Sequence, residues 1–237
     1  RAEIYFVDAA RAMVESGDSL VPRYRGEPFF DKPPLAYWLM AASFRAFGFT
    51  LTAARLVPVA AALALLLATA WLGRLIFDRA TGVAAAAVLA STLLFLTFGR
   101  VAMSDMLLAL WTTLAVALAL AADRSEGGRR APAAALGLVL GLGFLTKGPI
   151  ALLLPGLGIL AWAWRSRRLP LRAGEIALGA VVFAATALPW FVLVYRRLGA
   201  APLEYFFLRE NLERFAGETY DAGRSPAYYL GAYLAVG

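Results

Sequence analysis

The sequence predicts an all-α integral membrane protein, and three observations support this class. Apolar residues make up 61% of the 237 positions and charged residues 16%, whereas soluble domains average about 45–50% and about 25%. The apolar residues gather in stretches close to the roughly 20 residues that a spanning helix needs. Lys and Arg gather mainly in short segments between these stretches, which is the pattern that sets membrane topology. Together these features predict a single helical domain over residues 1–237.

The membrane-embedded part is expected over residues 56–195, with about six transmembrane helices. Within it, Lys147, Gly148 and Pro149 predict a tight turn, because Pro breaks a helix and Gly permits a reversal of the chain. The start of a further transmembrane helix is expected in residues 226–237. The six expected spans cover residues 56–77, 82–99, 105–122, 132–147, 149–164 and 174–195.

Two less apolar segments are expected outside the membrane. Residues 1–55 predict a first non-cytoplasmic loop with interfacial helices over 4–15 and 33–47, the second of which is aromatic-rich and begins with Pro. Residues 196–225 predict a second large non-cytoplasmic loop with a helix over 203–215. Because the sequence starts without Met and stops within an apolar run, we expect it to be a fragment that is incomplete at both ends.

The basic segments predict which helix ends share a side of the membrane. Three arginines lie in 123–130 and four in 165–172, and Arg74 and Arg79 flank the end of the first span. These three segments alternate correctly to lie together in the cytoplasm. The two larger loops and the Lys147 turn then lie on the opposite side.

The residue types limit the chemistry that this chain can perform. It has no His and no Cys, so acid–base chemistry must use carboxylates, Lys, Tyr or Arg, and thiolate metal sites are excluded. The net charge of +7 comes mostly from the basic segments, so membrane lipids or a phosphorylated substrate are expected partners and nucleic acid is not. Both charge signs recur at the helix ends on the non-cytoplasmic side, which predicts a mixed-charge site there.

Asp31 and Lys32 are the strongest candidates for that site. Aromatic residues precede them, and Pro33 and Pro34 follow and fix the backbone. A rigid segment suits a functional group, and Lys is a compact cation that suits a phosphate. The structural alternative is a solvated loop in which Lys32 contacts lipid headgroups.

Five further charged residues on this side have structural alternatives that stay open. Asp105 stands where it would cap the start of a helix. Arg100 and Lys147 would be membrane anchors. Glu3 would lie on a solvated face, and Arg214 would belong to a charged helix face.

Sequence blocks along the whole chain carry a family resemblance. In order they include AEIYFVDAARAM, GEPFFDKPPLAYW, AARL, LTKGP and PWF. FFDKPPLAYW (29–38) and LTKGP (145–149) are the most specific. With these blocks the chain resembles the bacterial membrane glycosyltransferases of the dolichyl-phosphate-mannose protein mannosyltransferase and aminoarabinose transferase type.

The resemblance implies both a fold and a reaction. The fold would be of the GT-C type, a bundle of many transmembrane helices with periplasmic amphipathic helices near the membrane. The reaction would be an inverting transfer of a sugar from a polyprenyl-phosphate-linked donor to a lipid or protein acceptor. It would take place at the periplasmic face of the bacterial inner membrane. No cofactor is required, and a divalent cation stays open.

The resemblance also implies roles for individual residues. Asp31 and Lys32 would lie in the active site, with Lys32 on the lipid phosphate, and Arg100, Asp105 and Lys147 would line the cavity. Positive groups there would stabilise the leaving phosphate electrostatically. The expected substrate-binding set is Lys32, Tyr37, Arg100, Asp105, Lys147 and Arg214.

The first acidic pair departs from the family pattern. Relatives of this type usually begin the first outer loop with two acids, often Asp-Glu, whereas this chain has Ala2 and Glu3. Either Glu3 performs the catalytic work, or Asp31 takes more of it, or the protein is impaired. We expect Glu3 and Asp31 as catalytic carboxylates that orient or deprotonate the acceptor hydroxyl, and as the ligands of any divalent cation.

Two other classes of protein stay open at this stage. A secondary transporter would place polar groups on broken helices near the midplane and would show internal repeats, whereas the charges here lie at helix ends and no repeat is visible. A non-catalytic membrane scaffold is consistent with Ala2 in the acidic pair.

Overall fold

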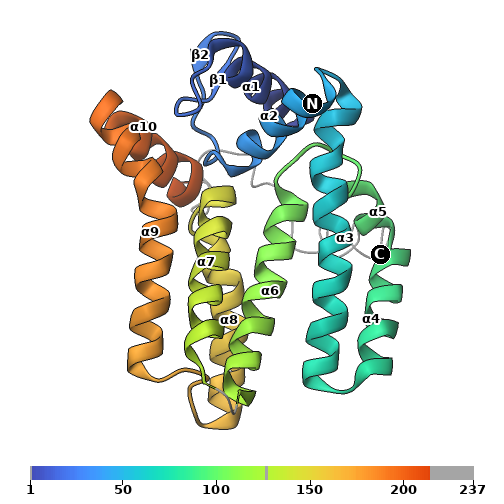
Figure 1. Cartoon of the computed structure of the whole chain (residues 1–237). Coiled ribbons are helices and arrows are strands. Elements are labelled where there is room, and N and C mark those ends of the chain that lie inside the picture. Colours follow the sequence, from blue (N-terminus) through green and yellow to red (C-terminus); the bar gives the residue numbers. More distant parts are fainter. Residues whose placement is uncertain (1, 126–127, 214–237) are drawn as a thin grey trace.

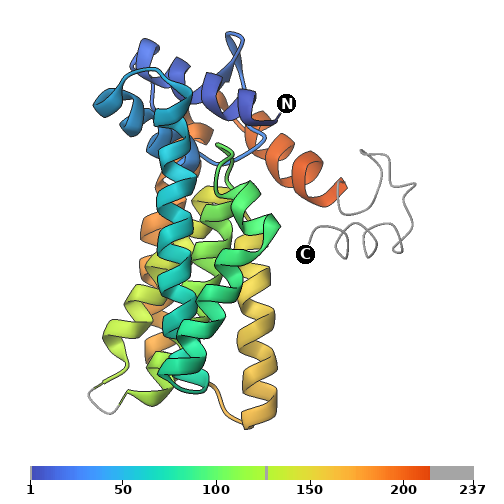
Figure 2. The same ribbon diagram turned by 90° about the vertical axis from the view of Figure 1, so that its right-hand side faces the viewer.

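The computed structural model describes residues 2–125 and 128–213, and this part of the chain is almost wholly helical (Figure 1). Helices run side by side in a bundle, and the N-terminal segments lie across one end of it (Figures 1 and 2). The helices of the bundle are α3 (Leu51–Ile76), α4 (Arg79–Ser91), α5 (Leu93–Phe98), α6 (Asp105–Arg124), α7 (Arg130–Lys147), α8 (Ile150–Ser166) and α9 (Ala173–Leu198).

Within the described residues, three helices are long and apolar enough to cross a membrane: α3, α6 and α9. Helices α4 and α8 are apolar but shorter. The expected class of an all-α membrane bundle is therefore confirmed. The expected division of the chain into loops and about six spans stays a prediction.

The segments across the end of the bundle come from the parts of the sequence before and after the bundle helices. Helices α1 (Ala2–Ser16) and α2 (Leu35–Phe47) correspond to the two expected interfacial helices, and α10 (Ala201–Glu204) continues into the π-helix η1 (Tyr205–Glu213). Between α1 and α2 lies a small hairpin that the sequence did not predict, β1 (Arg23–Tyr24) and β2 (Glu27–Pro28). Its two-residue turn, Arg25 and Gly26, has positive φ at both positions, as a type I′ turn requires.

One expected span differs from the sequence prediction. Residues 82–99 do not form a continuous helix, because α4 ends and α5 begins at Thr92. Thr92 is extended, with φ −74° and ψ 140°, and its hydroxyl accepts a hydrogen bond from the N–H of Phe95 at 3.3 Å. A side-chain oxygen that caps a new helix in this way competes with continuation of the old one.

The expected turn at Lys147 is present. Helix α7 ends at Lys147, Gly148 follows with φ 72°, and α8 begins at Ile150. A Cβ at Gly148 would lie 2.5 Å from the ring of Phe206 in η1. Glycine is therefore required both for the backbone conformation and for the close approach of η1.

Two buried apolar clusters attach the end segments to the bundle. The first joins α1 and α2 to α3 and α6, and includes Met13, Met40 and Phe44. The second joins α2 to the ends of α7 and α9 and to η1, and includes Trp190 and Phe206. Each fully buried side chain of this size contributes roughly 1.5–3 kcal/mol. These contacts fix the positions of the polar residues between the clusters.

Candidate active site

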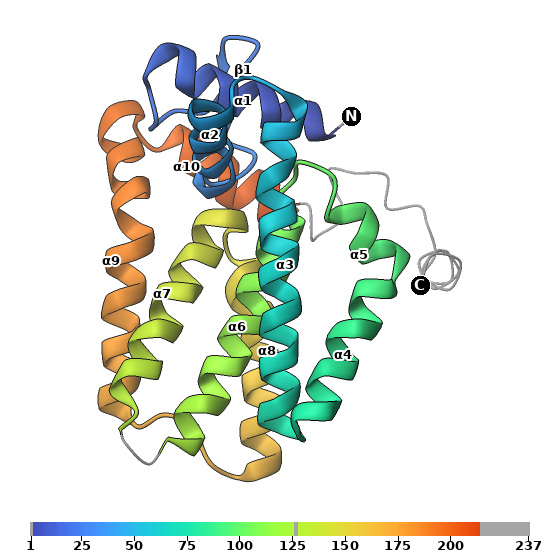
Figure 3. The same cartoon turned by 45° about the vertical axis from the view of Figure 1, so that its right-hand side comes forward.

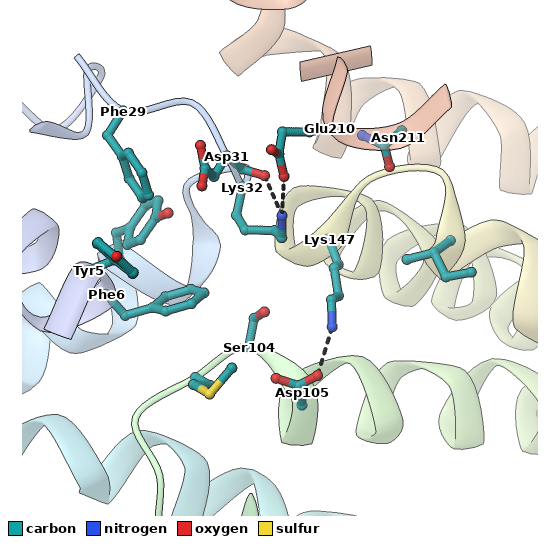
Figure 4. A pocket seen from close by; sticks show the side chains of 13 residues that line it. Tyr5, Phe6, Phe29, Asp31, Lys32, Ser104, Asp105, Lys147, Glu210 and Asn211 are labelled. Carbon is teal, nitrogen blue, oxygen red and sulfur yellow. Dashed lines mark hydrogen bonds and ion pairs between the residues drawn. The ribbon is translucent and has the colours of Figure 1, made fainter. Parts of the chain in front are cut away.

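A cavity of about 460 Å³ lies where α1, the β2–α2 segment, the start of α6, the α7–α8 turn and η1 meet (Figure 4). We call it the lysine cavity. One side of its wall is aromatic, from Tyr5, Phe6 and Phe29. Its polar lining residues are Asp31, Lys32, Tyr37, Ser104, Asp105, Lys147, Glu210 and Asn211. Five residues of the expected site are thus brought together from distant parts of the sequence.

Lys32 is held against η1 by an ion pair. Its Nζ donates to Glu210 Oε2 at 3.2 Å and to the backbone oxygen of Asp31 at 2.6 Å. The side chains of Lys32 and Glu210 are 17% and 8% exposed. The two prolines after Lys32 restrict the chain before α2 begins, so the ammonium group is presented from a stiff segment.

Asp31 lies beside Lys32 and contacts the same C-terminal segment. Its Oδ1 accepts a hydrogen bond from the hydroxyl of Tyr205 at 3.1 Å. Tyr205 is the first residue of η1. The position of Asp31 therefore depends on the docking of η1 against the N-terminal loop.

Lys147 and Asp105 form the second ion pair of the cavity (Figure 4). Lys147 Nζ donates to Asp105 Oδ1 at 2.7 Å. Lys147 is the last residue of α7 and Asp105 the first residue of α6, so the pair joins two helix ends. The other oxygen of Asp105, Oδ2, is buried and has no hydrogen-bond partner among the described residues. It can accept a hydrogen bond from a ligand.

The hydroxyl of Tyr37 is a second buried polar atom of the cavity wall that lacks a hydrogen-bond partner within the described ranges. Tyr37 is 0% exposed and comes from the first turn of α2. Burial raises the pKa of Tyr37 far above its ordinary range, and the negative charges of Asp31 and Glu210 raise it further. The side chain is therefore a neutral phenol that can donate to a ligand.

Glu3 lies outside the lining of this cavity. Its carboxylate accepts two hydrogen bonds from the Arg55 guanidinium, at 2.8 and 2.9 Å, and one from the N–H of Ala102 at 2.9 Å. Arg55 holds the pKa of Glu3 below its ordinary value, with help from Ala102 and against partial burial. Because Met103 and Ser104 follow Ala102 and line the cavity, Glu3 supports the cavity wall from behind.

The remaining expected residues have different outcomes. Arg100 is exposed in the segment between α5 and α6 and is not among the residues that line the cavity. Arg214 lies outside the described residues. Within residues 2–125 and 128–213, no group of three or more His, Cys, Asp or Glu side chains is placed to hold a metal ion.

Sequence reasoning missed the contribution of η1. Glu210 and Tyr205 contact Lys32 and Asp31 across 178 and 174 positions of sequence. The sequence placed Glu210 among the charged residues of the non-cytoplasmic side but gave it no role in the site. An acidic residue on an amphipathic helix carries no sequence signal for so distant a partner.

The fold and the lysine cavity define a class: a helical membrane protein that gathers lysines and carboxylates at one end of its bundle. Comparison with known families then identifies the group within this class. The family model of dolichyl-phosphate-mannose-protein mannosyltransferase matches residues 31–192, and the chain belongs to this family. The resemblance inferred from the sequence is thereby confirmed.

Curated and solved relatives agree with this assignment. An undecaprenyl phosphate-alpha-4-amino-4-deoxy-L-arabinose arabinosyl transferase 1 from Sodalis glossinidius is 34% identical over 99% of this chain and 42% of its own length. A transferase of the same type from Pseudomonas aeruginosa is 36% identical over 96% of this chain and 42% of its own length. The chain therefore spans about 42% of the length of these relatives.

A solved structure extends the likeness to three dimensions. The crystal structure of ArnT from Cupriavidus metallidurans bound to undecaprenyl phosphate has a TM-score of 0.78 to this chain at 27% identity. The match covers 90% of this chain and 40% of that one. The apo structure of the same protein matches with a TM-score of 0.75.

Proposed function

We propose that the full-length protein is an inverting glycosyltransferase that moves a sugar from a polyprenyl-phosphate donor to a lipid or protein acceptor. The observation that carries the proposal is the lysine cavity, in which Lys32 and Lys147 face a shared space with Asp31. Membership of a mannosyltransferase family and likeness to named arabinosyl transferases support it. A likeness to ArnT bound to undecaprenyl phosphate supports the choice of donor.

The charges of the cavity suit the bond that must break. In an inverting transfer, the acceptor oxygen bonds to the anomeric carbon as the bond from that carbon to the phosphate oxygen breaks. The leaving phosphate gains negative charge, which Lys32 and Lys147 stabilise in a partly buried site. The acceptor hydroxyl loses its proton to a carboxylate. We assign this role to Asp31, because it lines the cavity whereas Glu3 is bound to Arg55 behind the wall.

The charged groups at the two ends of the bundle support a location for the protein in the membrane. The connections from α3 to α4, from α6 to α7 and from α8 to α9 carry the Arg-rich segments and lie at one end of the bundle, whereas α1, α2 and the α7–α8 turn, which line the lysine cavity, lie at the other end (Figure 1). Arg-rich segments favour the cytoplasm. We therefore propose that the protein lies in the bacterial inner membrane with the cavity at its periplasmic face. A polyprenyl chain would then stay in the bilayer while its phosphate reaches the two lysines.

Sugar transfer by the full-length protein in membranes tests this function. Wild-type protein should transfer labelled sugar from a polyprenyl-phosphate donor, and Lys32→Met should lower kcat/KM by roughly 10- to 100-fold, since a hydrogen bond to a charged group is worth about 1.5–3 kcal/mol. Arg11→Met is the matched control, because Arg11 is 57% exposed and pairs with Glu15 on the surface of α1.

Two results would overturn the proposal. One is a wild-type protein that transfers nothing from any polyprenyl-phosphate sugar while it carries a solute across proteoliposomes, which would identify a transporter. The other is equal activity of Lys32→Met and Arg11→Met, which would remove the lysine cavity from the reaction.

A further inference from the structure

A second pocket, of about 480 Å³, lies at the opposite end of the bundle from the lysine cavity. It is formed by the last turns of α6 and α8 and the end of α3, which lie close together there (Figure 3). We call it the arginine pocket. Its polar lining residues are Asp123, Arg124, Ser166 and Arg168. Apolar side chains, among them Ile76, Val116, Leu120 and Ile159, form the rest of its wall.

Asp123 is the unusual residue of this pocket. Its side chain is only 7% exposed, and its Oδ2 accepts a hydrogen bond from Arg168 at 3.0 Å. Its Oδ1 is buried and has no hydrogen-bond partner among the described residues. A buried acceptor left unsatisfied is costly, and a carboxylate near a helix C-terminus is disfavoured by the helix dipole. The arrangement therefore calls for a donor from outside the chain.

The basic residues of the pocket specify the other half of the ligand. Arg124 and Arg168 lie beside Asp123 in the lining, and guanidinium groups bind phosphate oxygens through paired hydrogen bonds. Arg168 also lies over the ring of Trp162, 5.9 Å from its centre, which orients it at the mouth of the pocket. A ligand that satisfies both sets of groups carries a phosphate and, next to it, a hydrogen-bond donor with positive charge.

The surroundings of the pocket are suited to acyl chains. Along α8, Leu157, Leu160 and Trp164 are 57%, 61% and 85% exposed. In a membrane protein, such a surface faces lipid, and basic pockets between helices at the cytoplasmic side bind lipid headgroups. In the orientation proposed above, the helix ends that form the pocket would lie at the depth of the cytoplasmic lipid headgroups.

We infer that the arginine pocket binds a phospholipid with a primary ammonium headgroup, such as phosphatidylethanolamine. The phosphate lies on Arg124 and Arg168, and the ammonium group donates to Asp123 Oδ1. Choline cannot do this, because its nitrogen has no hydrogen to donate. The site is independent of the proposed transfer reaction, since Asp123 lies 18 residues along α6 from Asp105, or about 27 Å at the helical rise.

Lipid titration of delipidated full-length protein in detergent, followed by native mass spectrometry, tests the inference. The probes are phosphatidylethanolamine, phosphatidylcholine and phosphatidylglycerol with identical acyl chains. Wild-type protein should bind the ethanolamine lipid about tenfold more tightly than the choline lipid, which corresponds to about one charged hydrogen bond. Asp123→Asn should abolish this preference. Arg168→Ala should weaken the binding of all three lipids, whereas Arg165→Ala, an exposed Arg outside the lining, should not.

Three outcomes would overturn the inference. Equal binding of the ethanolamine and choline lipids by wild-type protein would remove the ammonium contact. An ethanolamine preference that survives in Asp123→Asn would place the ammonium contact at another residue. Tightest binding of phosphatidylglycerol, unchanged in Asp123→Asn, would indicate a plain basic surface. If Asp123→Asn does not elute as folded protein in gel filtration, the comparison of Arg168→Ala with Arg165→Ala still decides whether the pocket binds lipid.

Discussion

The buried hydroxyl of Tyr37 should contribute to substrate binding and not to folding. It has no hydrogen-bond partner among the described residues, yet it lines the lysine cavity on a fully buried side chain. Tyr37→Phe removes only this oxygen and keeps the ring that packs against Phe6, whose centre lies 5.3 Å away. Tyr37→Phe should therefore weaken substrate binding without lowering the stability of the fold.

The expected magnitudes follow from the two states of the cavity. Without substrate, the substitution removes a desolvated polar group and breaks no bond, so stability should stay unchanged or rise by up to about 2 kcal/mol. In the proposed complex, the phenol donates to a charged phosphate oxygen of the donor, and the loss of this hydrogen bond should cost about 1.5–3 kcal/mol. This loss corresponds to roughly a 10- to 100-fold weaker interaction with the donor.

The assay combines thermal unfolding with binding of polyprenyl phosphate and with the donor KM of the full-length protein. Tyr195→Phe is the control, because Tyr195 on α9 is 57% exposed and lies outside the cavity lining. The reasoning is refuted if Tyr37→Phe unfolds at a clearly lower temperature while donor binding stays at the wild-type level. That result would mean that the hydroxyl has a structural partner.

Two further substitutions test how the site is supported. The low pKa of Glu3 means that its contribution to stability is present at neutral pH and is lost as pH falls through that pKa, below the ordinary value of 4.5. Glu3→Gln should therefore lower stability at pH 7 by about 1 kcal/mol. It should also flatten the decline in stability that thermal unfolding records as pH falls below 4.5, and an unchanged slope would contradict this. Gly148→Ala should destabilise by about 1–3 kcal/mol, because the new Cβ meets Phe206 and φ is positive. Gly156→Ala on α8, where a Cβ meets nothing within 4 Å, should be neutral or stabilising in the same denaturation experiment, and equal losses in the two variants would argue against the close approach of η1.

Most of the helices were predictable from the sequence, because apolar runs and their Gly, Pro and Arg boundaries are local signals. The Lys147 turn is an example, since Gly148 supplies the positive φ that ends α7. The break at Thr92 was not predictable in this way. The Thr92 hydroxyl donates back to the carbonyl of Leu89 in α4 at 2.9 Å and also accepts from the N–H of Phe95 in α5. A hydroxyl within an apolar run can also occur in an unbroken helix, so its presence in the sequence does not predict the break.

The candidate site was only half visible in the sequence. Asp31, Lys32 and Lys147 stand in short specific blocks, and the structure places them around one cavity. The same blocks did not reveal that Glu3 would be occupied by Arg55, because that contact spans 52 positions. The partner of Lys32 on η1 was hidden for the same reason. Contacts between distant segments are set by the packing of the whole chain, and no local sequence pattern reports them.

The charge balance of the lysine cavity leads to the last prediction. When all are ionised, Lys32 and Lys147 face three carboxylates in the lining, those of Asp31, Asp105 and Glu210, which leaves a formal charge of −1. A phosphate would make the cavity more negative, so binding needs a further positive group. Arg100 is the nearest candidate in sequence, since it begins the segment that supplies Met103 and Ser104 to the wall.

We therefore expect Arg100→Met to weaken binding of polyprenyl phosphate by about tenfold, as the loss of one charged contact would, and EDTA to leave binding unchanged. The opposite pattern, with loss in EDTA, recovery in Mg²⁺ and no effect of Arg100→Met, would mean that a divalent cation supplies the charge. Either pattern is measurable on the full-length protein by equilibrium binding of the lipid. In the proposed complex, each lysine ammonium can bind a phosphate oxygen and keep its carboxylate partner, because it has three N–H donors. Binding of the lipid should weaken as ionic strength rises. This dependence should be less steep than for a surface site, because the partly buried charges are screened less by salt.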